Sequence, residues 1–203
     1  MAQGNKEKPL HSLIPFGEFK ALMGVDDRDD KISRFCLITA THTIEQYCKR
    51  RLLRKKNFEY IGYCGDIELP LGEYPVTNIL ALYILLPKQE PMILEPELYE
   101  VNPYSGSDID IPHFILLSPA IKQYRNISGF KAVYNSGYAM GKVPPDLASA
   151  CLELAAWNMA RYRGRRIGMT GAVRGNAKDG EHFELSMPEN VRSLLEPYRR
   201  KVI

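Results

Sequence analysis

The chain has 203 residues, of which 45% are hydrophobic and 25% are charged, and this suits one globular domain with its own core. The apolar share excludes an intrinsically disordered chain. The longest apolar run, residues 79–86, is far shorter than the roughly 20 residues of a membrane-spanning helix. No apolar segment follows the polar first residues, so we expect neither a secretory signal nor a membrane partner.

The net charge of +3 is unevenly distributed along the chain. From Arg161 onward there are ten Lys and Arg residues and five acidic ones, so this segment carries +5 and everything before it carries −2. A basic terminal segment on a mildly acidic body indicates a polyanion or an acidic protein groove as a neighbour. A solvated arm explains the same composition equally well.

The N-terminal quarter predicts two helices. Residues 14–24 form a short one that ends at Gly24. A long helix, about 29–52, follows, with a core-facing stripe of Leu37, Ala40, Ile44, Tyr47 and Cys48. Four carboxylates within residues 26–30 precede it, and we interpret them as a helix cap rather than a calcium site, because the alternating ligands, central glycine and final glutamate of an EF-hand are missing. The cations at 49–51 suit a helix C-terminus better than a binding patch.

The middle of the chain, about 57–136, predicts an antiparallel β meander. β-branched and aromatic residues are concentrated in short runs at 58–63, 76–86, 98–101, 114–117 and 130–134. Residues 69–75 and 102–106 have the proline, glycine and asparagine of turns. No helical pattern intervenes, which excludes βαβ units.

The C-terminal third predicts two more helices separated by a loop. A helix of about 144–163 begins with prolines in its first turn, and its apolar face is formed by Leu147, Ala150, Cys151, Leu154, Trp157 and Tyr162. Residues 164–178 are rich in glycine and arginine and predict a flexible loop. Residues 186–190 cap a last short helix. The fold class is therefore α+β, a small helical bundle with an inserted antiparallel β meander.

Nothing in the sequence indicates catalysis. Of the four histidines, His11 and His182 lie in polar segments, and His42 has no second histidine at zinc-protease spacing. The cysteines Cys36, Cys48, Cys64 and Cys151 show no metal-site spacing, so we interpret all four as reduced and structural. Motifs for acyl transfer, phosphate binding or dinucleotide binding are absent. We expect no enzyme, no catalytic, metal or cofactor-binding residues, and no cofactor.

The ordered set of these features resembles the phage head–tail connector (head-completion adaptor) family of long-tailed phages, prophages and gene-transfer particles. Five pieces carry the resemblance: the short helix 16–24, the helix end Ile44-Glu45-Gln46-Tyr47-Cys48-Lys49-Arg50-Arg51, the turn Leu69-Pro70-Leu71-Gly72-Glu73-Tyr74-Pro75-Val76, the pair 133–138 and 143–147, and the ending from Met187-Pro188 to Arg200. The chain departs from smaller members in its longer middle region, about 88–123, and in its glycine- and arginine-rich loop.

The resemblance implies one head–tail connector domain over 1–203, with a β-rich insertion at about 57–136 and a flexible loop plus C-terminal docking helix at about 164–203. It implies a non-enzymatic ring, expected to be a dodecamer, at the head–tail junction of the virion, assembled in the host bacterial cytoplasm. Such a ring docks under the portal protein and offers a platform to a downstream neck, stopper or tail protein. Double-stranded DNA passes through its channel with non-specific contacts.

Two groups of residues are candidate contact sites. The apolar, tyrosine and arginine side chains of the terminal helix suit a docking peptide for the portal: Val191, Leu194, Leu195, Pro197, Tyr198, Arg199 and Arg200. Packing of Leu194 and Leu195 on their own subunit is the open alternative. The arginines of the loop could face the channel and its DNA, or remain in solvent: Arg163, Arg165, Arg166 and Arg174.

Two other functions remain open. A cytoplasmic nucleic-acid-binding module would use the same basic tail, and its affinity would fall steeply with salt. Another neck or tail-completion protein of the same particle would differ in binding a tail terminator instead of the portal.

Overall fold

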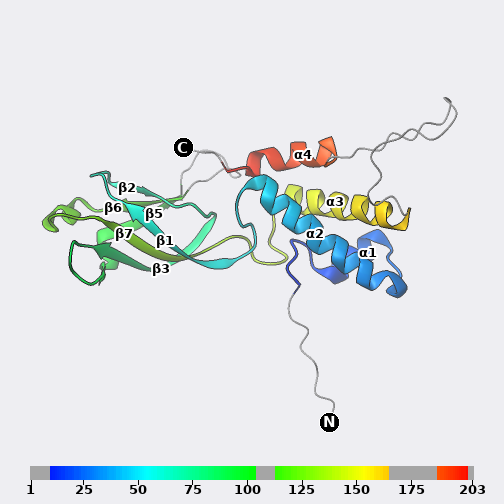
Figure 1. The fold of residues 1–203 in the computed structure, drawn as a ribbon, viewed down its shortest axis with the longest axis horizontal. Coiled ribbons are helices and arrows are strands. Elements are labelled where there is room, and N and C mark those ends of the chain that lie inside the picture. The colour runs from blue at the N-terminus through cyan, green and yellow to red at the C-terminus, as the bar shows by residue number, and fades with distance from the viewer. Residues whose placement is uncertain (1–9, 104–112, 165–186, 201–203) are drawn as a thin grey trace, which may run out of the picture. The chain divides into compact units, whose positions relative to one another are not determined.

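The computed structural model describes residues 10–103, 113–164 and 187–200, which form two compact units (Figure 1). Unit 1 combines residues 1–49 and 140–203 and contains the α-helices, whereas unit 2, Arg50–Ala139, contains the strands and the 3₁₀ helices η2 (Pro96–Leu98) and η3 (Pro119–Gln123). The predicted α+β class is confirmed. Within the described part of the chain, no helix is both long enough and apolar enough to cross a bilayer.

Unit 1 contains the helices that the sequence predicts. They are α1 (Phe16–Met23), α2 (Asp30–Cys48), α3 (Pro145–Arg163) and α4 (Glu189–Leu195), with one-turn 3₁₀ helices η1 (Asp27–Asp29) and η4 (Glu196–Tyr198). The predicted end of α1 is confirmed, because Gly24 takes the left-handed conformation at φ 58° and its N–H donates to the Lys20 carbonyl. The cap residue Ser186 lies outside the described residues, and Pro188 precedes α4.

The long helix ends at Cys48, four residues before the predicted end at 52. Lys49 adopts the left-handed conformation at φ 54°, and its N–H donates back to the carbonyls of Glu45 and Gln46, which closes the helix without a glycine. Arg50 is 4% exposed, lies 3.9 Å from the centre of the Tyr74 ring and donates to the Tyr74 carbonyl at 2.9 Å. The interpretation of these cations as a helix terminus therefore fits Lys49, which is the C-cap of α2, but not Arg50, which is a packed residue of unit 2.

The core of unit 1 lies between α2 and α3. Small side chains on both helices allow close approach, and they are buried together with larger ones: Cys36, Leu37, Ala40, Ile44, Cys48, Leu147, Ala150, Cys151, Leu154, Ala155 and Met159. Trp157 and Tyr162, predicted for the core face, are only half-buried. The Arg161 guanidinium covers the Trp157 ring at 4.5 Å, and the Tyr162 ring meets the Phe35 ring edge-on at 5.5 Å. Met159 occupies the buried position instead.

Unit 2 consists of two antiparallel sheets. The four-stranded sheet has the order β1 (Lys55–Gly62), β7 (Gly129–Ser136), β3 (Val76–Leu85) and β4 (Met92–Ile93). The three-stranded sheet has the order β2 (Glu68–Pro70), β6 (His113–Leu117) and β5 (Tyr99–Pro103). The five predicted strands are present with shifted ends, and β7, the last in sequence, lies in the centre of its sheet.

Two short strands were missed by the sequence analysis. β2 lies inside the predicted turn 69–75, where Leu69 pairs with Ile115 of β6 and Leu69 and Leu71 are 2% and 3% exposed. β4 is a two-residue strand beside β3. Neither segment is long enough to show the alternation by which a strand is recognised in sequence. The predicted turn at 102–106 lies partly outside the described residues, and β5 extends to Pro103.

A single hydrophobic cluster joins the two sheets. Leu82, Ile84, Phe130, Ala132 and Tyr134 of the four-stranded sheet are buried with residues of the three-stranded sheet and its loops: Leu69, Leu71, Leu94, Ile115, Leu117 and Ile121. At its edge the Tyr134 hydroxyl donates to Glu59 at 2.7 Å and accepts from the Glu73 N–H at 3.2 Å. Burial, followed by the hydrogen bond to Glu59, raises the pKa of Tyr134 far above its ordinary value, so the phenol stays protonated.

Replacing Gly137 by alanine is expected to destabilise unit 2 strongly. Gly137 has φ 90°, and a Cβ there would lie 2.6 Å from the Leu53 carbonyl oxygen. Left-handed strain and a clash with rigid backbone together cost about 3 kcal/mol or more. Gly62→Ala is the matched control, because a Cβ at Gly62 meets nothing within 4 Å. Urea unfolding followed by circular dichroism compares the two variants, and equal midpoints would contradict this account.

Candidate functional site

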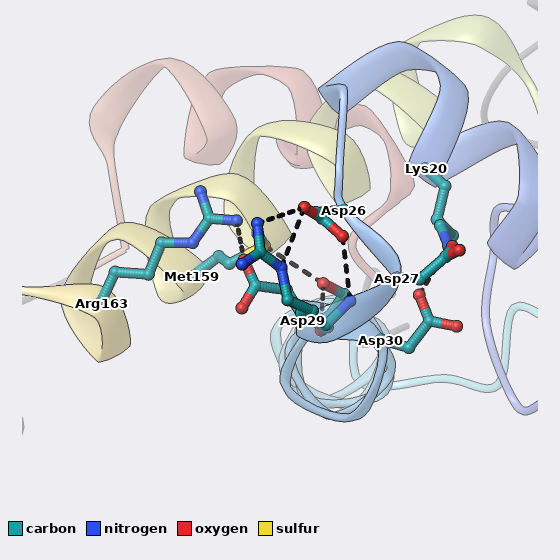
Figure 2. A network of polar contacts seen from close by, with 9 residues as sticks. Lys20, Asp26, Asp27, Asp29, Asp30, Met159 and Arg163 are labelled. Atoms are coloured by element: carbon teal, nitrogen blue, oxygen red, sulfur yellow. Dashed lines mark hydrogen bonds and ion pairs between the residues drawn. The ribbon is translucent and has the colours of Figure 1, made fainter.

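The acidic run 26–30 joins three helices of unit 1 (Figure 2). Lys20 of α1 pairs with Asp27 and, at 2.6 Å, with Asp30 at the start of α2. The hydrogen bonds to Asp27 and Asp30 raise the pKa of Lys20. Ser33 of α2 donates to the Asp29 carbonyl at 2.7 Å. These carboxylates therefore have partners within the chain and act in folding.

The acidic run does cap a helix, as predicted, but the capped helix is the 3₁₀ helix η1 and not α2. The Asp26 carboxylate accepts from the Arg28 N–H at 3.2 Å and caps η1, whereas Asp29, which directly precedes α2, makes no side-chain cap hydrogen bond. Arg28 also pairs with Asp26 at 2.8 Å, and its hydrogen bonds lower the pKa of Asp26. The run thus adds a 3₁₀ turn that leads into α2.

Arg163, one of four arginines predicted to face a channel, is paired within unit 1. Its guanidinium donates to Asp29, so the last turn of α3 is attached to the start of α2 (Figure 2). Half of the Arg163 side chain remains exposed. The other three, Arg165, Arg166 and Arg174, lie outside the described residues.

The terminal helix divides into a buried side and an exposed side. Val191, Leu195 and Tyr198 are at most 1% exposed, and the Tyr198 hydroxyl donates to Asp146 of α3 at 3.2 Å. The Arg200 N–H donates to the Cys48 carbonyl at the end of α2 at 2.8 Å. Three of the seven predicted docking residues therefore serve the core of unit 1, because α4 packs its apolar side on this chain. Leu194, which is half-buried, and Pro197, Arg199 and Arg200, which are exposed, remain available to a partner.

The outer face of the four-stranded sheet carries exposed aromatic and aliphatic side chains. Strand register places Tyr60 of β1 opposite Lys131 of β7, Lys131 opposite Tyr83 of β3, and Tyr83 opposite Ile93 of β4. The Lys131 ammonium lies 5.7 Å and 5.6 Å from the centres of the two tyrosine rings. Phe58, in the next row of the same face, is 63% exposed, Tyr60 is 70% exposed and Ile93 is 67% exposed. We call Phe58, Tyr60, Tyr83, Ile93 and Lys131 the outer sheet face.

Exposed aromatic and aliphatic side chains gathered on one sheet face make the outer sheet face a candidate interaction site. The sequence analysis assigned β-structure to Phe58 and Tyr60, but it did not identify them as a surface. The sequence of β1 already indicates that Phe58 and Tyr60 share one face of the sheet, because they are two residues apart in a strand and both have large aromatic side chains.

A second group missed by the sequence analysis lies in unit 1. His11, His42 and Glu45 meet, and Glu45 is 5% exposed. The N-terminal side of this group is ordered, because Ser12, Leu13 and Ile14 are all at most 3% exposed. His42 and Glu45 share one face of α2 at a spacing of three, which the sequence contains, but His11 is 31 positions from His42 and only the fold brings it to them.

Three of the four cysteines are buried, as predicted, and one is not. Cys36, Cys48 and Cys151 lie in the core of unit 1, whereas Cys64 is exposed, so its structural interpretation is wrong. Burial raises the pKa of Cys36 and of Cys151 to about 11. Both thiols are therefore protonated at neutral pH and unsuited to nucleophilic chemistry.

Comparison with known proteins yields a fold rather than a family. No protein-family model and no curated protein matches the chain. Among solved structures, three chains match 94% of this chain over 91% of their own length. They come from the neck of an empty GTA particle with C6 symmetry (TM-score 0.61, 17% identity), the virion of a native gene transfer agent (GTA) particle (0.60, 18%), and the neck of a native GTA particle with C12 symmetry (0.57, 18%). Likeness at this identity establishes a shared fold.

Truncating Leu195 is expected to destabilise unit 1, because its side chain is fully buried against this chain. Leu195→Ala should lower the free energy of unfolding by about 2–5 kcal/mol. Arg199→Ala is the control on the exposed side. Its ion pair with Glu196, at 3.6 Å, is solvent-exposed and contributes less than about 1 kcal/mol. Urea unfolding measures both, and a Leu195 variant as stable as the Arg199 variant would contradict the burial of α4.

A thiol assay tests the positions of the cysteines. Ellman's reagent at pH 8 should react quickly with Cys64 alone in the folded chain and with all four cysteines after denaturation. Cys64→Ser should remove the fast phase and leave the total reduced by one. A fast phase that persists in this variant would show that one of the core thiols is accessible.

Proposed function

We propose that the chain is a non-enzymatic structural protein of the neck of a phage-like particle, where copies of it form a ring at the head–tail junction. The observation that carries this proposal is the fold shared with neck chains of gene transfer agent particles over nearly the full length of both chains. The resemblance at residues 16–24, 44–51, 69–76, 133–147 and 187–200 supports the same assignment and narrows it to a head–tail connector. The ring is expected to be a dodecamer that docks under the portal protein.

The outer sheet face supplies a surface for contact between copies. Cyclic rings close through heterologous contacts, in which one surface of a subunit meets a different surface of the next. Tyr60, Tyr83 and Ile93 offer the apolar surface that such an interface needs. Lys131 lies between the two tyrosine rings, and Lys56 supplies a cation on the edge strand β1. The C6 and C12 symmetry of the neighbouring assemblies makes a second copy of this chain the proposed occupant.

The exposed side of the terminal helix is the proposed docking site for the portal. Leu194, Pro197, Arg199 and Arg200 combine an apolar contact with two guanidinium groups, which suits an acidic groove on a partner. The opposite end of the ring would receive the downstream neck, stopper or tail protein. Phosphate contacts carry no sequence information, so passing double-stranded DNA needs only scattered cations.

A nucleic-acid-binding module is the rival from another class. Among the described cations of the basic tail, Arg163 is paired with Asp29 and Arg199 with Glu196, and Arg161 covers Trp157. Pairing within the chain reduces the charge offered to phosphates, which favours the structural role. The rival predicts a monomer or dimer with affinity for duplex DNA that falls by roughly 0.9 log units per log unit of salt for each phosphate contacted.

Ring formation is expected to depend on the outer sheet face. Native mass spectrometry of the purified chain, alone and with a candidate portal, should detect rings. Ile93→Lys, which places a charge at a 67% exposed position of that face, should reduce the ring population at least tenfold, because an unpaired charge would be buried in the contact. Gln89→Lys, an exposed position in the turn between β3 and β4 with the same change of charge, should leave it unchanged.

Two outcomes would contradict these proposals separately. If Ile93→Lys and Gln89→Lys assemble alike, the outer sheet face is not the contact between copies. If the wild-type chain stays monomeric under both conditions and binds duplex DNA tightly with a steep salt dependence, the rival function replaces the neck assignment.

A further inference from the structure

Three metal-binding side chains from two separate segments of unit 1 lie together. His11 precedes α1, and His42 and Glu45 are three residues apart on α2, so they share one face of that helix. One donor atom from each lies within 4.8 Å of the other two. His11 Nε2 is 3.1 Å from Glu45 Oε2, and the centres of the two imidazole rings are 5.2 Å apart. We propose that these three side chains bind a divalent transition-metal ion.

The segment that carries His11 is held in place on α2. The Leu13 N–H donates to the Thr41 hydroxyl at 3.1 Å, and the Ser12 hydroxyl donates to the Ile14 carbonyl at 2.8 Å. Ser12, Leu13 and Ile14 are all buried. The backbone next to His11 is thus fixed before any ion arrives, so binding costs little conformational entropy.

Glu45 gives the cluster its charge. Its carboxylate is 5% exposed, and its Oε2 accepts a hydrogen bond from His11 Nε2. A divalent ion placed between this carboxylate and the two imidazoles would be attracted by the negative charge of the carboxylate. The His11 side chain is 40% exposed and His42 is exposed, so an ion can enter from solvent.

The donor set selects the class of metal. Two imidazole nitrogens and one carboxylate oxygen suit zinc, copper, nickel or cobalt, whereas magnesium and calcium prefer oxygen ligands. Donors bound to zinc at 2.0–2.1 Å in a tetrahedron lie about 3.3 Å apart. The His11–Glu45 pair has nearly this separation already. No pair of donor atoms is more than 4.8 Å apart, so zinc binding requires an approach of at most about 1.5 Å between any two of them. The His42 side chain is exposed, and rotation of its ring would shorten its distances to the other donors.

The geometry assigns a structural role to this ion. Bound to three side chains, it would connect the segment before α1 to the middle of α2, with water in the remaining position. Unit 1 would then be stabilised by the ion in proportion to its concentration relative to the dissociation constant. The proposal is independent of the neck assignment, because metal binding and ring formation are measured separately.

Isothermal titration of Zn²⁺ into the metal-stripped full chain, prepared without a histidine tag, tests the site. One ion per chain should bind. His42→Ala and Glu45→Gln should each weaken binding at least tenfold, because each removes one of three ligands. Glu45→Gln keeps the size of the side chain and removes its charge, and circular dichroism of each variant checks that the fold is retained. His113→Ala, which removes a histidine from β6 of unit 2, is the matched control and should bind as the wild type does.

A second readout separates this site from adventitious binding. Co²⁺ in place of Zn²⁺ should give visible absorption bands that His42→Ala abolishes and His113→Ala preserves, and excess Mg²⁺ should not displace it. Zn²⁺ should also raise the unfolding temperature of the wild type but not of His42→Ala. Absence of saturable binding, or equal binding by the two histidine variants, would overturn the proposal and leave His11 and Glu45 as a hydrogen-bonded pair only.

Discussion

The contact between α2 and α3 is the interaction on which unit 1 depends. Alanines and cysteines on both helices bring their backbones close, and every other element of the unit is fastened to one of the two. α1 is attached through Lys20 and Asp30, and the segment before it through Thr41. The 3₁₀ helix η4, which follows α4, is attached through Tyr198 and Asp146. Exposed ion pairs add little by themselves, so the buried stripe determines the stability and the polar contacts fix the positions.

α1, α3 and α4 could be predicted because each has an apolar stripe at helical spacing with a proline or glycine near an end. α2 could be predicted from its stripe and from the acidic run 26–30 that precedes it. The end of α2 could not, because Lys49 takes the left-handed conformation that glycine usually occupies. The position of Arg50 under the Tyr74 ring likewise depends on a residue 24 positions away. The central position of β7 in its sheet could not be predicted either, because a run of β-forming residues indicates a strand but not the strands it pairs with.

The candidate sites show the same division between local and long-range information. The terminal helix was identified by its residue types, but only the fold separates buried Val191, Leu195 and Tyr198 from exposed Arg199. His11 and His42 are 31 positions apart, and their meeting with Glu45 follows from the docking of buried Leu13 on α2. For the outer sheet face, the sequence of β1 places Phe58 and Tyr60 on one side of a strand. That Lys131 and Tyr83 lie beside them follows only from the register of β1, β7 and β3 in the structure.

The outer sheet face combines exposed apolar rings with cations that lie over them. Lys131 lies between two tyrosine rings at 5.7 Å and 5.6 Å, and Lys56 lies 5.2 Å from the Phe58 ring. These ammonium groups keep the face hydrated before assembly, and cation–π contact keeps them over the rings. Burying the face against a second copy would also remove these cations from water. The free energy of their desolvation would offset part of the favourable free energy of burying the apolar side chains. In the ring proposed above, this polar cost would limit association between copies outside the assembly.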